Sequence, residues 1–237
     1  MQFRWASAGA IGEHFVEKIR VAEKQICPIC IKRRAERYCP AKGEKICAID
    51  CGIEREVSID CPADCTYLIA AHRWEQEHPK PLAESEVPFP DVSFPPELIR
   101  MRQGVMSGIG YTVASYAREQ RSLNDADILA AGHALAETYR TLGSGIYYEK
   151  PPDNVVAAGL YAALAKFIEE EKKHEAEHPE FPALKDPEIF HLFVFFERFG
   201  RLRSNGRPRT RAFLEFLRAQ FPAETAAAKE ESRIILP

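Results

Sequence analysis

All seven cysteines of this 237-residue chain lie between Cys27 and Cys65, in the stretch CPICIKRRAERYCPAKGEKICAIDCGIEREVSIDCPADC. A stretch this short and polar cannot bury enough apolar surface to fold on its own, so a further kind of bond has to stabilise it. The choices are disulfides, redox chemistry and metal coordination. Which of them holds decides how the first third of the chain can fold.

Disulfides are the least suitable of these choices. The opening MQFRWASAGAIGEHFVEKIR makes a poor signal peptide, because charged residues interrupt it from Glu13 onward. No window approaches the roughly 18 apolar residues of a membrane helix. We therefore expect a cytoplasmic, reducing location, where cysteines bind metal more often than they pair. The odd number of cysteines points the same way, and the expected strand–helix context of a redox Cys-x-x-Cys is missing.

Zinc coordination explains the cysteine spacing best. Cys27-Pro-Ile-Cys30 predicts a knuckle whose backbone N–H groups can point at the sulfurs. Two further cysteine pairs follow, and one cysteine stands alone. Bonds from zinc to thiolates supply the free energy that a small polar module lacks. The candidate ligands are Cys27, Cys30, Cys39, Cys47, Cys51, Cys61 and Cys65.

Seven thiolates are too many for one tetrahedral site and one too few for two. We therefore expect two structural zinc ions and an eighth ligand. His72 is favoured, because neutral imidazole suits zinc better than a lone carboxylate. It lies about two helical turns, roughly 10 Å, beyond Cys65. Asp50 is the second candidate, since Cys47-Ala-Ile-Asp50 repeats the Cys-x-x-ligand spacing, and a solvent molecule is the third.

The order of these residues resembles the cross-braced zinc fingers of the HIT and MYND type, over residues 27–72. The resemblance is carried by the Cys-x-x-Cys knuckle, Tyr38-Cys39-Pro40, a second cysteine pair, and a closing thiol and histidine. The insertion GIEREVSID and the missing terminal His-x-x-x-Cys depart from the pattern. The resemblance implies a protein-interaction module with alternating ligand pairs. It implies two sites. Cys27, Cys30, Cys47 and Cys51 would form one, and Cys39, Cys61, Cys65 and His72 would form the other.

Composition divides the chain into four parts. The prolines of HPKPLAESEVPFPDVSFPPE favour an extended connector, and its apolar residues predict that it lies along a neighbouring surface. The expected parts are an N-terminal helical segment at 1–22, the zinc module at 23–78, the connector at 79–96 and a helical bundle at 97–237.

Beyond residue 96, apolar residues recur at spacings of three and four, which predicts helices. The segment FHLFVFFERF is apolar on nearly every face, so we expect it in the core. The predicted fold class is mainly α, with a cross-braced or treble-clef-like zinc module followed by an all-α bundle of about five helices. The expected helices are 97–120, 125–142, 154–178, 187–202 and 209–221, with a short polar helix at 223–233.

HEAEH at 174–178 matches the His-Glu-x-x-His pattern of zinc proteases, with His174 and His178 as ligands and Glu175 as the base. A catalytic site needs this pair held in a dry cleft. The charged flank EEEKK and the helix-ending Pro179 are instead typical of a solvated helix end. A metallohydrolase is therefore a remote alternative.

A second cluster is basic. Its arginines could bind phosphate or an acidic protein, and with the basic run 32–37 they would form a nucleic-acid footprint. Nearby glutamates offer internal partners instead, which is the interpretation we favour. The candidate anion-binding residues are Arg198, Arg201, Arg203, Arg207, Arg209 and Arg211.

The remaining residues give little support for catalysis. The net charge of −3 provides no global argument for nucleic acid or an anionic membrane. We find no nucleophile–base pair and no cofactor fingerprint; His133, Tyr139 and the segment 145–150 predict only a small polar pocket. The sequence therefore predicts a zinc-stabilised adaptor that binds a protein partner, with nucleic-acid binding as the alternative.

Overall fold

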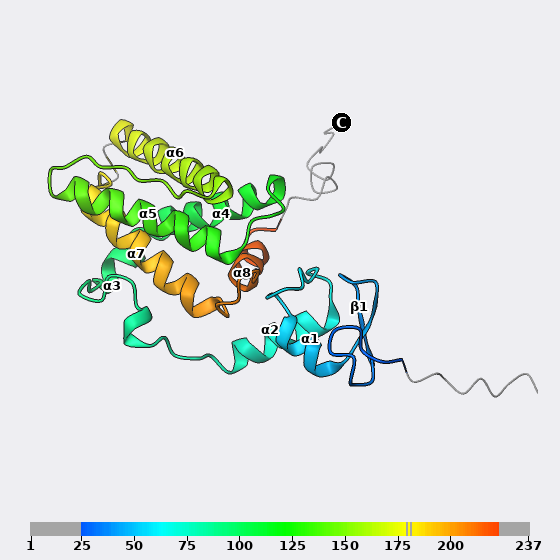
Figure 1. The fold of residues 1–237 in the computed structure, drawn as a ribbon. Helices are drawn as coiled ribbons and strands as arrows, with labels where there is room; N and C mark the ends of the chain where they lie inside the picture. Colours follow the sequence, from blue (N-terminus) through cyan, green and yellow to red (C-terminus); the bar gives the residue numbers. More distant parts are fainter. Residues whose placement is uncertain (1–24, 179, 181, 223–237) are drawn as a thin grey trace, which may run out of the picture. The chain divides into compact units, whose positions relative to one another are not determined.

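The computed structural model describes residues 25–178, 180 and 182–222 (Figure 1). The helices predicted at 1–22 and 223–233 lie outside the described residues. Within the described residues the chain is mainly helical with a two-stranded sheet, so the mainly α fold class is confirmed. The elements are β1 (Arg37–Cys39), β2 (Glu44–Ile46), α1 (Ala48–Glu54), α2 (Thr66–Glu77), the 3-10 helix η1 (Glu84–Glu86), α3 (Pro96–Met101), α4 (Gln103–Glu119), α5 (Asp125–Gly143), α6 (Val155–Glu177), α7 (Asp186–Arg203) and α8 (Ala212–Gln220).

The chain forms two compact units, which divide between Arg55 and Glu56. The sequence predicts the end of the first module near residue 78 instead. The difference arises because Glu56 bonds to the helical part of the chain. Its carbonyl accepts a hydrogen bond from the Arg209 N–H at 2.8 Å, and its carboxylate accepts one from Asn205 Nδ2 at 2.9 Å.

In its described residues, 25–55, the first unit contains a tight turn, a hairpin and a short helix. The Ile31 N–H donates to the Cys27 carbonyl at 2.8 Å and closes the turn. Strands β1 and β2 pair antiparallel, with Tyr38 opposite Lys45. Gly43, in the connection between them, has a φ of +69°, which glycine adopts without steric cost. Helix α1 follows β2 directly, so the turn and the start of α1 flank the hairpin.

The proline-rich connector packs on the helical bundle, as its apolar residues predict. Phe89 and Phe94 lie against the bundle core, and the Phe94 ring meets the Phe195 ring edge-on at 5.8 Å. Arg198 donates hydrogen bonds to the carbonyls of Pro88 and Phe89. These contacts fix the connector along α7.

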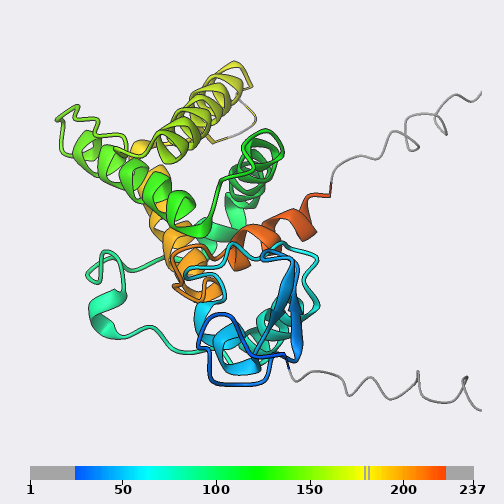
Figure 2. The ribbon, with the colours of Figure 1, turned by 45° about the vertical axis from the view of Figure 1, so that its right-hand side comes forward.

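The bundle is centred on α5 and α7, which share its most extensive contact. Helix α6 packs on α4 and α5, and α8 packs on α4, α5 and α7; Figures 1 and 2 show α5 and α6 side by side. The core includes Phe193 and Phe196 of α7 and Phe213 of α8, all buried. The prediction that the phenylalanine-rich segment forms core is thus confirmed. No helix within the described residues has the length and apolar composition needed to cross a membrane.

The helix predicted at 97–120 is broken at Arg102. Helix α3 ends at Met101 and α4 begins at Gln103, with Arg102 at φ −100° and ψ 22° between them. The Arg102 side chain is buried and bonds to Glu175 and Glu188. Apolar spacing continues through the break, so periodicity alone could not reveal it.

Gly200 gives a test of how tightly the bundle is packed. A Cβ atom there would lie 2.7 Å from Phe213 Cε1 and 2.8 Å from Leu129 Cδ2, on α8 and α5. We expect Gly200→Ala to lower the free energy of unfolding by about 1–3 kcal/mol, because both neighbours would have to move. Gly104→Ala, on an exposed helical position with no atom within 4 Å of the added Cβ, should raise it by up to about 1 kcal/mol. Urea unfolding of the two variants tests this, and effects of equal sign would contradict it.

Candidate metal centre

Three cysteines and one aspartate converge in the first unit. One ligand atom each from Cys27, Cys30, Cys47 and Asp50 lies within 4.8 Å of the others. Cys27, Cys47 and Asp50 are buried, and Cys30 is partly buried. With Zn–S bonds of about 2.3 Å, sulfurs at the corners of a tetrahedron lie roughly 3.8 Å apart. The four side chains are therefore close enough to surround one ion.

The first two ligand candidates come from the turn before the hairpin. Backbone N–H groups of Cys30, Cys47 and Ile29 donate toward the Cys27 sulfur. Burial on its own raises the pKa of the Cys27 thiol, but these donors outweigh it, so the pKa is lowered overall. The turn at Cys27-Pro-Ile-Cys30 thus has backbone N–H groups directed at a sulfur, which is the geometry expected of a knuckle.

The other two ligand candidates, Cys47 and Asp50, lie at the start of α1. Cys47 is the residue that caps the helix, and its sulfur accepts a hydrogen bond from the Asp50 N–H at 3.3 Å. Residues at the cap and the third helical position face each other, as in a capping box. This local geometry brings the Asp50 carboxylate beside the Cys47 sulfur.

The two oxygens of Asp50 have different partners. Oδ2 accepts hydrogen bonds from Cys27 Sγ at 3.1 Å and Cys47 Sγ at 3.0 Å, whereas Oδ1 lies 3.3 Å from Arg33 Nη1. Hydrogen bonds from the three thiols, led by Cys30, lower the pKa of Asp50 to about 2. The carboxylate is therefore ionised at neutral pH. Oδ2 is placed to bind a cation, which would replace the thiol protons that converge on it.

The charges around the site also suit a cation. Three thiolates and one carboxylate carry four negative charges, of which a divalent ion neutralises two. Arg33 adds a positive charge directly at Asp50. Part of the basic run 32–37 therefore has a partner inside the first unit.

This group differs from the set implied by the zinc-finger resemblance at one position. The resemblance implies Cys51 as the fourth ligand, but the structure brings Asp50 to that place and leaves Cys51 out of the group. Cys51 is one residue further along α1, so its side chain points about 100° away around the helix. Cys39, Cys61 and Cys65 belong to no cluster of three or more potential ligands in the described parts of the chain.

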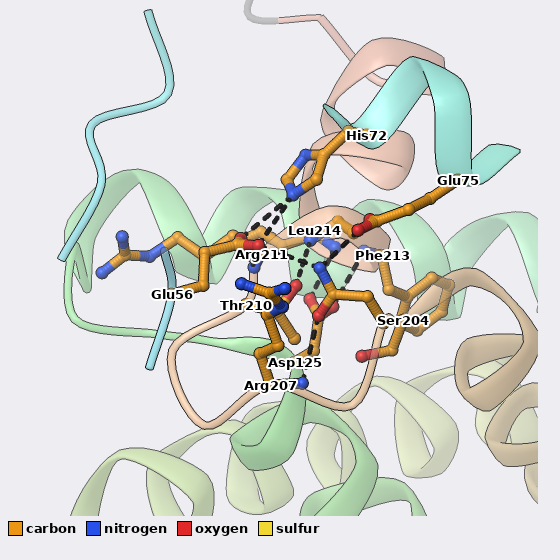
Figure 3. A network of polar contacts seen from close by, with 12 residues as sticks. Glu56, His72, Glu75, Asp125, Ser204, Arg207, Thr210, Arg211, Phe213 and Leu214 are labelled. Carbon is orange, nitrogen blue, oxygen red and sulfur yellow. Dashed lines mark hydrogen bonds and ion pairs between the residues drawn. The ribbon is translucent and has the colours of Figure 1, made fainter. Parts of the chain in front are cut away.

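His72 has a carboxylate partner. Its Nε2 lies 3.0 Å from each carboxylate oxygen of the buried Glu56 (Figure 3). Asn205 Nδ2 donates to the same carboxylate, so the contact joins α2 to the loop between α7 and α8. Sequence reasoning missed Glu56, because nothing in the local pattern marks it. The second ion on Cys39, Cys61, Cys65 and His72 stays a prediction.

The same network contains Asp125, which is fully buried. Its carboxylate accepts hydrogen bonds from the backbone N–H groups of Phe213 and Leu214, both at 3.0 Å (Figure 3). Asn124 is the residue that caps α5, so Asp125 is free to cap α8 from across the bundle. Burial raises the pKa of Asp125 to about 6. These bonds fix the start of α8 and the loop before it.

We expect the Glu56–His72 pair to stabilise the fold most between about pH 4.5 and 6.5. Burial raises the pKa of Glu56, but bonds from His72 and Asn205 outweigh it and leave the pKa below its usual 4.5. Burial lowers the pKa of His72, but Glu56 outweighs it and leaves the pKa above its usual 6.5. The contribution of Glu56 is therefore lost as the pH falls through its lowered pKa. The contribution of His72 is lost as the pH rises through its raised pKa.

Unfolding of the unaltered protein and of His72→Gln from pH 5 to 9 measures this dependence. The difference in free energy of unfolding should be largest near pH 6 and shrink by about 1–2 kcal/mol at alkaline pH. A difference that does not change with pH would contradict the pairing.

The arginine cluster mostly contacts protein groups. Arg201 Nη2 lies 2.8 Å from Glu197, and Arg211 Nη1 lies 2.9 Å from Asp60. The Arg203 guanidinium lies over the rings of Phe199 and Phe216, at 5.2 and 4.5 Å from their centroids. Arg198 binds the connector, Arg207 belongs to the network of Figure 3, and Arg209 is exposed. This arrangement favours internal pairing over a free anion-binding surface.

The HEAEH segment ends α6. The rings of His174 and His178 have centroids 4.6 Å apart. Glu175 is buried and forms an ion pair with Arg102 Nη1 at 2.9 Å, so it is engaged in the packing of the bundle. Glu180 Oε1 lies 3.1 Å from His178 Nδ1, but in the residues that the structure describes the two histidines belong to no cluster of three potential ligands.

Comparison with known proteins gives no relative: no protein-family model, no curated protein and no solved structure matches the chain. The candidate site therefore stands on its geometry.

Proposed function

We propose that the chain is a zinc-stabilised adaptor, whose first unit folds around one structural zinc ion and binds a protein partner. The observation that carries the metal proposal is the convergence of Cys27, Cys30, Cys47 and Asp50 within 4.8 Å. Three thiolate sulfurs and one carboxylate oxygen form a donor set that suits zinc. Because the protein fills all four positions, none is left for a substrate, as is typical of structural sites.

The order of elements supports this assignment. Two ligands lie in a turn, a hairpin follows, and two more lie at the start of a helix. This order supports the treble-clef-like arrangement, one of the two options that the sequence predicts. The metal then bridges the turn and the helix, which the small hairpin alone holds together weakly.

The surface of the first unit supports a protein partner. Ile49 and Ile53 lie one turn apart on α1 and are 50% and 59% exposed, and Ile31 is 77% exposed. Several exposed large apolar side chains on so small a unit support an interaction surface. Lys32 and Arg34 are exposed as well, so the partner surface we propose is apolar with an acidic border.

Metal analysis of the purified protein tests the zinc proposal. We expect about one zinc ion per chain from the Cys27 group, and about two if the second predicted site also binds. Cys47→Ser should remove the ion of the Cys27 group, whereas Cys51→Ser should retain it, because Cys51 lies outside the group. Retention of zinc in Cys47→Ser together with loss in Cys51→Ser would contradict the proposed ligand set.

A photo-crosslinking residue at position 53 tests the interface, with position 42, exposed in the hairpin connection, as the control. We expect one defined protein adduct at 53, none at 42, and loss of the adduct when Ile49 is replaced by serine. The exposed basic residues 32–34 leave nucleic acid as the second candidate. Binding to a generic oligonucleotide that weakens steeply with salt, without a protein adduct, would support that candidate instead.

A further inference from the structure

A cavity of about 280 Å³ lies between α5, α6 and the segment that joins them. This volume is just below the roughly 300 Å³ at which small-molecule sites begin. The sequence predicts a small polar pocket here, with Tyr139 and the segment 145–150 correctly included. His133, also predicted, does not line it; its Nδ1 lies 2.9 Å from Glu197.

The cavity has a buried floor and an exposed mouth. Tyr139, Thr138 and Tyr161 are buried, whereas Tyr147 is 70% exposed and Glu149 is exposed. The Tyr161 hydroxyl donates to Glu149 Oε1 at 3.0 Å and lies 3.1 Å from Thr138 Oγ1. The carboxylate is thereby held at the mouth, above the floor.

The two glutamates of the lining differ in their partners. Glu169 lies 3.6 Å from Lys172 Nζ, and this ammonium group is 6.0 Å from the centroid of the Tyr139 ring. The chain therefore already places a cation beside this carboxylate and a tyrosine. Glu149 has no lysine, arginine or histidine nitrogen within ion-pair distance in the described residues.

Two tyrosine rings beside Glu149 are also without ring partners. The Tyr139 ring stacks on Phe193, but for Tyr147 and Tyr161 the described residues provide no ring–ring or cation–ring contact. The faces of tyrosine rings attract cations, most strongly where water is excluded. Glu149 has tyrosine hydroxyls as partners but no cationic one. A carboxylate without a cation and two rings without ring partners together favour a ligand that is positively charged and apolar at its surface.

We propose that this cavity binds a small quaternary ammonium cation, with its charge against Glu149 and its methyl groups against Tyr147 and Tyr161. Such a cation needs no hydrogen-bond acceptor, which suits a carboxylate already bonded to a tyrosine hydroxyl. Burial and the neighbouring Glu149 carboxylate raise the pKa of Tyr161 to about 12, so the floor stays uncharged at neutral pH. The site is independent of the metal centre.

Calorimetric titration of the full chain with choline tests the proposal. The neutral isostere 3,3-dimethylbutan-1-ol has the same shape without the charge, and we expect it to bind at least about tenfold more weakly. A second arm uses the N-acetyl methylamide of trimethyllysine. Tighter binding of choline indicates a free small molecule as the natural ligand, and tighter binding of the lysine derivative indicates a modified side chain.

Two variants assign the binding to this cavity. Glu149→Gln keeps an oxygen that can accept from Tyr161 but loses the charge, and should weaken choline binding at least about tenfold. Tyr148→Ala changes an exposed neighbour that does not line the cavity, and should leave the affinity within about twofold. Absence of binding by both cations, equal binding of the neutral isostere, or an unchanged affinity in Glu149→Gln would overturn the proposal.

Discussion

Removal of zinc with a chelator is expected to unfold the first unit and to leave the helical bundle folded. Apart from its cysteines, the described part of the first unit, residues 25–55, buries few apolar side chains, among them Ile46 and Ala35. Structural zinc sites supply about 10–16 kcal/mol of apparent binding free energy, far more than this small interior can. The bundle has a large core of its own, built on α4–α8, so we expect it to stay folded without the metal.

Hydrogen–deuterium exchange measures this outcome segment by segment. Amides of β1, β2 and α1 should lose their protection in the chelated protein, while those of α5 and α7 should keep theirs. The Cys47→Ser variant serves as the control, because the chelator should not change its first unit further. Full protection of residues 37–46 in metal-free protein would contradict a structural role for the ion.

Arg102→Met is expected to lower the free energy of unfolding by about 3–5 kcal/mol, the usual cost of removing one partner from a buried ion pair. Arg102 Nη1 lies 2.9 Å from Glu175, and Nη2 lies 2.7 Å from Glu188. The same guanidinium donates to the carbonyls of Pro182 and Ala183. Methionine fills much of the space but removes the donor of Glu175 and of two carbonyls, and leaves Glu188 with only the Lys185 N–H.

Urea unfolding of Arg102→Met and of Arg100→Met separates this cost from a general effect of losing an arginine. Arg100 is exposed and two residues away, so its replacement should change stability by less than about 0.5 kcal/mol. Adding Glu175→Gln to Arg102→Met should recover part of the loss, because it removes one unpaired charge. A loss below about 1 kcal/mol in Arg102→Met would contradict a buried ion-pair cluster.

The helices of the bundle could be predicted because their information is local. For α5, the capping residue Asn124 and the regular apolar spacing both lie within the segment itself. The break at Arg102 could not be predicted, because its partners Glu175 and Glu188 are far away in the sequence. The start of α8 could not be predicted from local sequence either, because Asp125 caps it from another helix.

The candidate metal site, like the bundle, could be predicted only where the information is local. Cys27, Cys30 and Cys47 follow from spacing, and Asp50 was left open as one alternative beside His72. The choice between Asp50 and Cys51 depends on which residue of the first helical turn faces the Cys47 sulfur, and this is set by where α1 begins. The partner of His72 depends on how α2 packs against Glu56, which no local pattern encodes.

X-ray absorption at the zinc edge tests the central claim, coordination by three cysteines and Asp50, most directly. The account predicts about three sulfurs near 2.3 Å and one oxygen or nitrogen near 2.0 Å per zinc. In Asp50→Cys the average number of sulfurs should rise. Four sulfurs per zinc in the unaltered protein, or an average that does not change in Asp50→Cys, would contradict the claim.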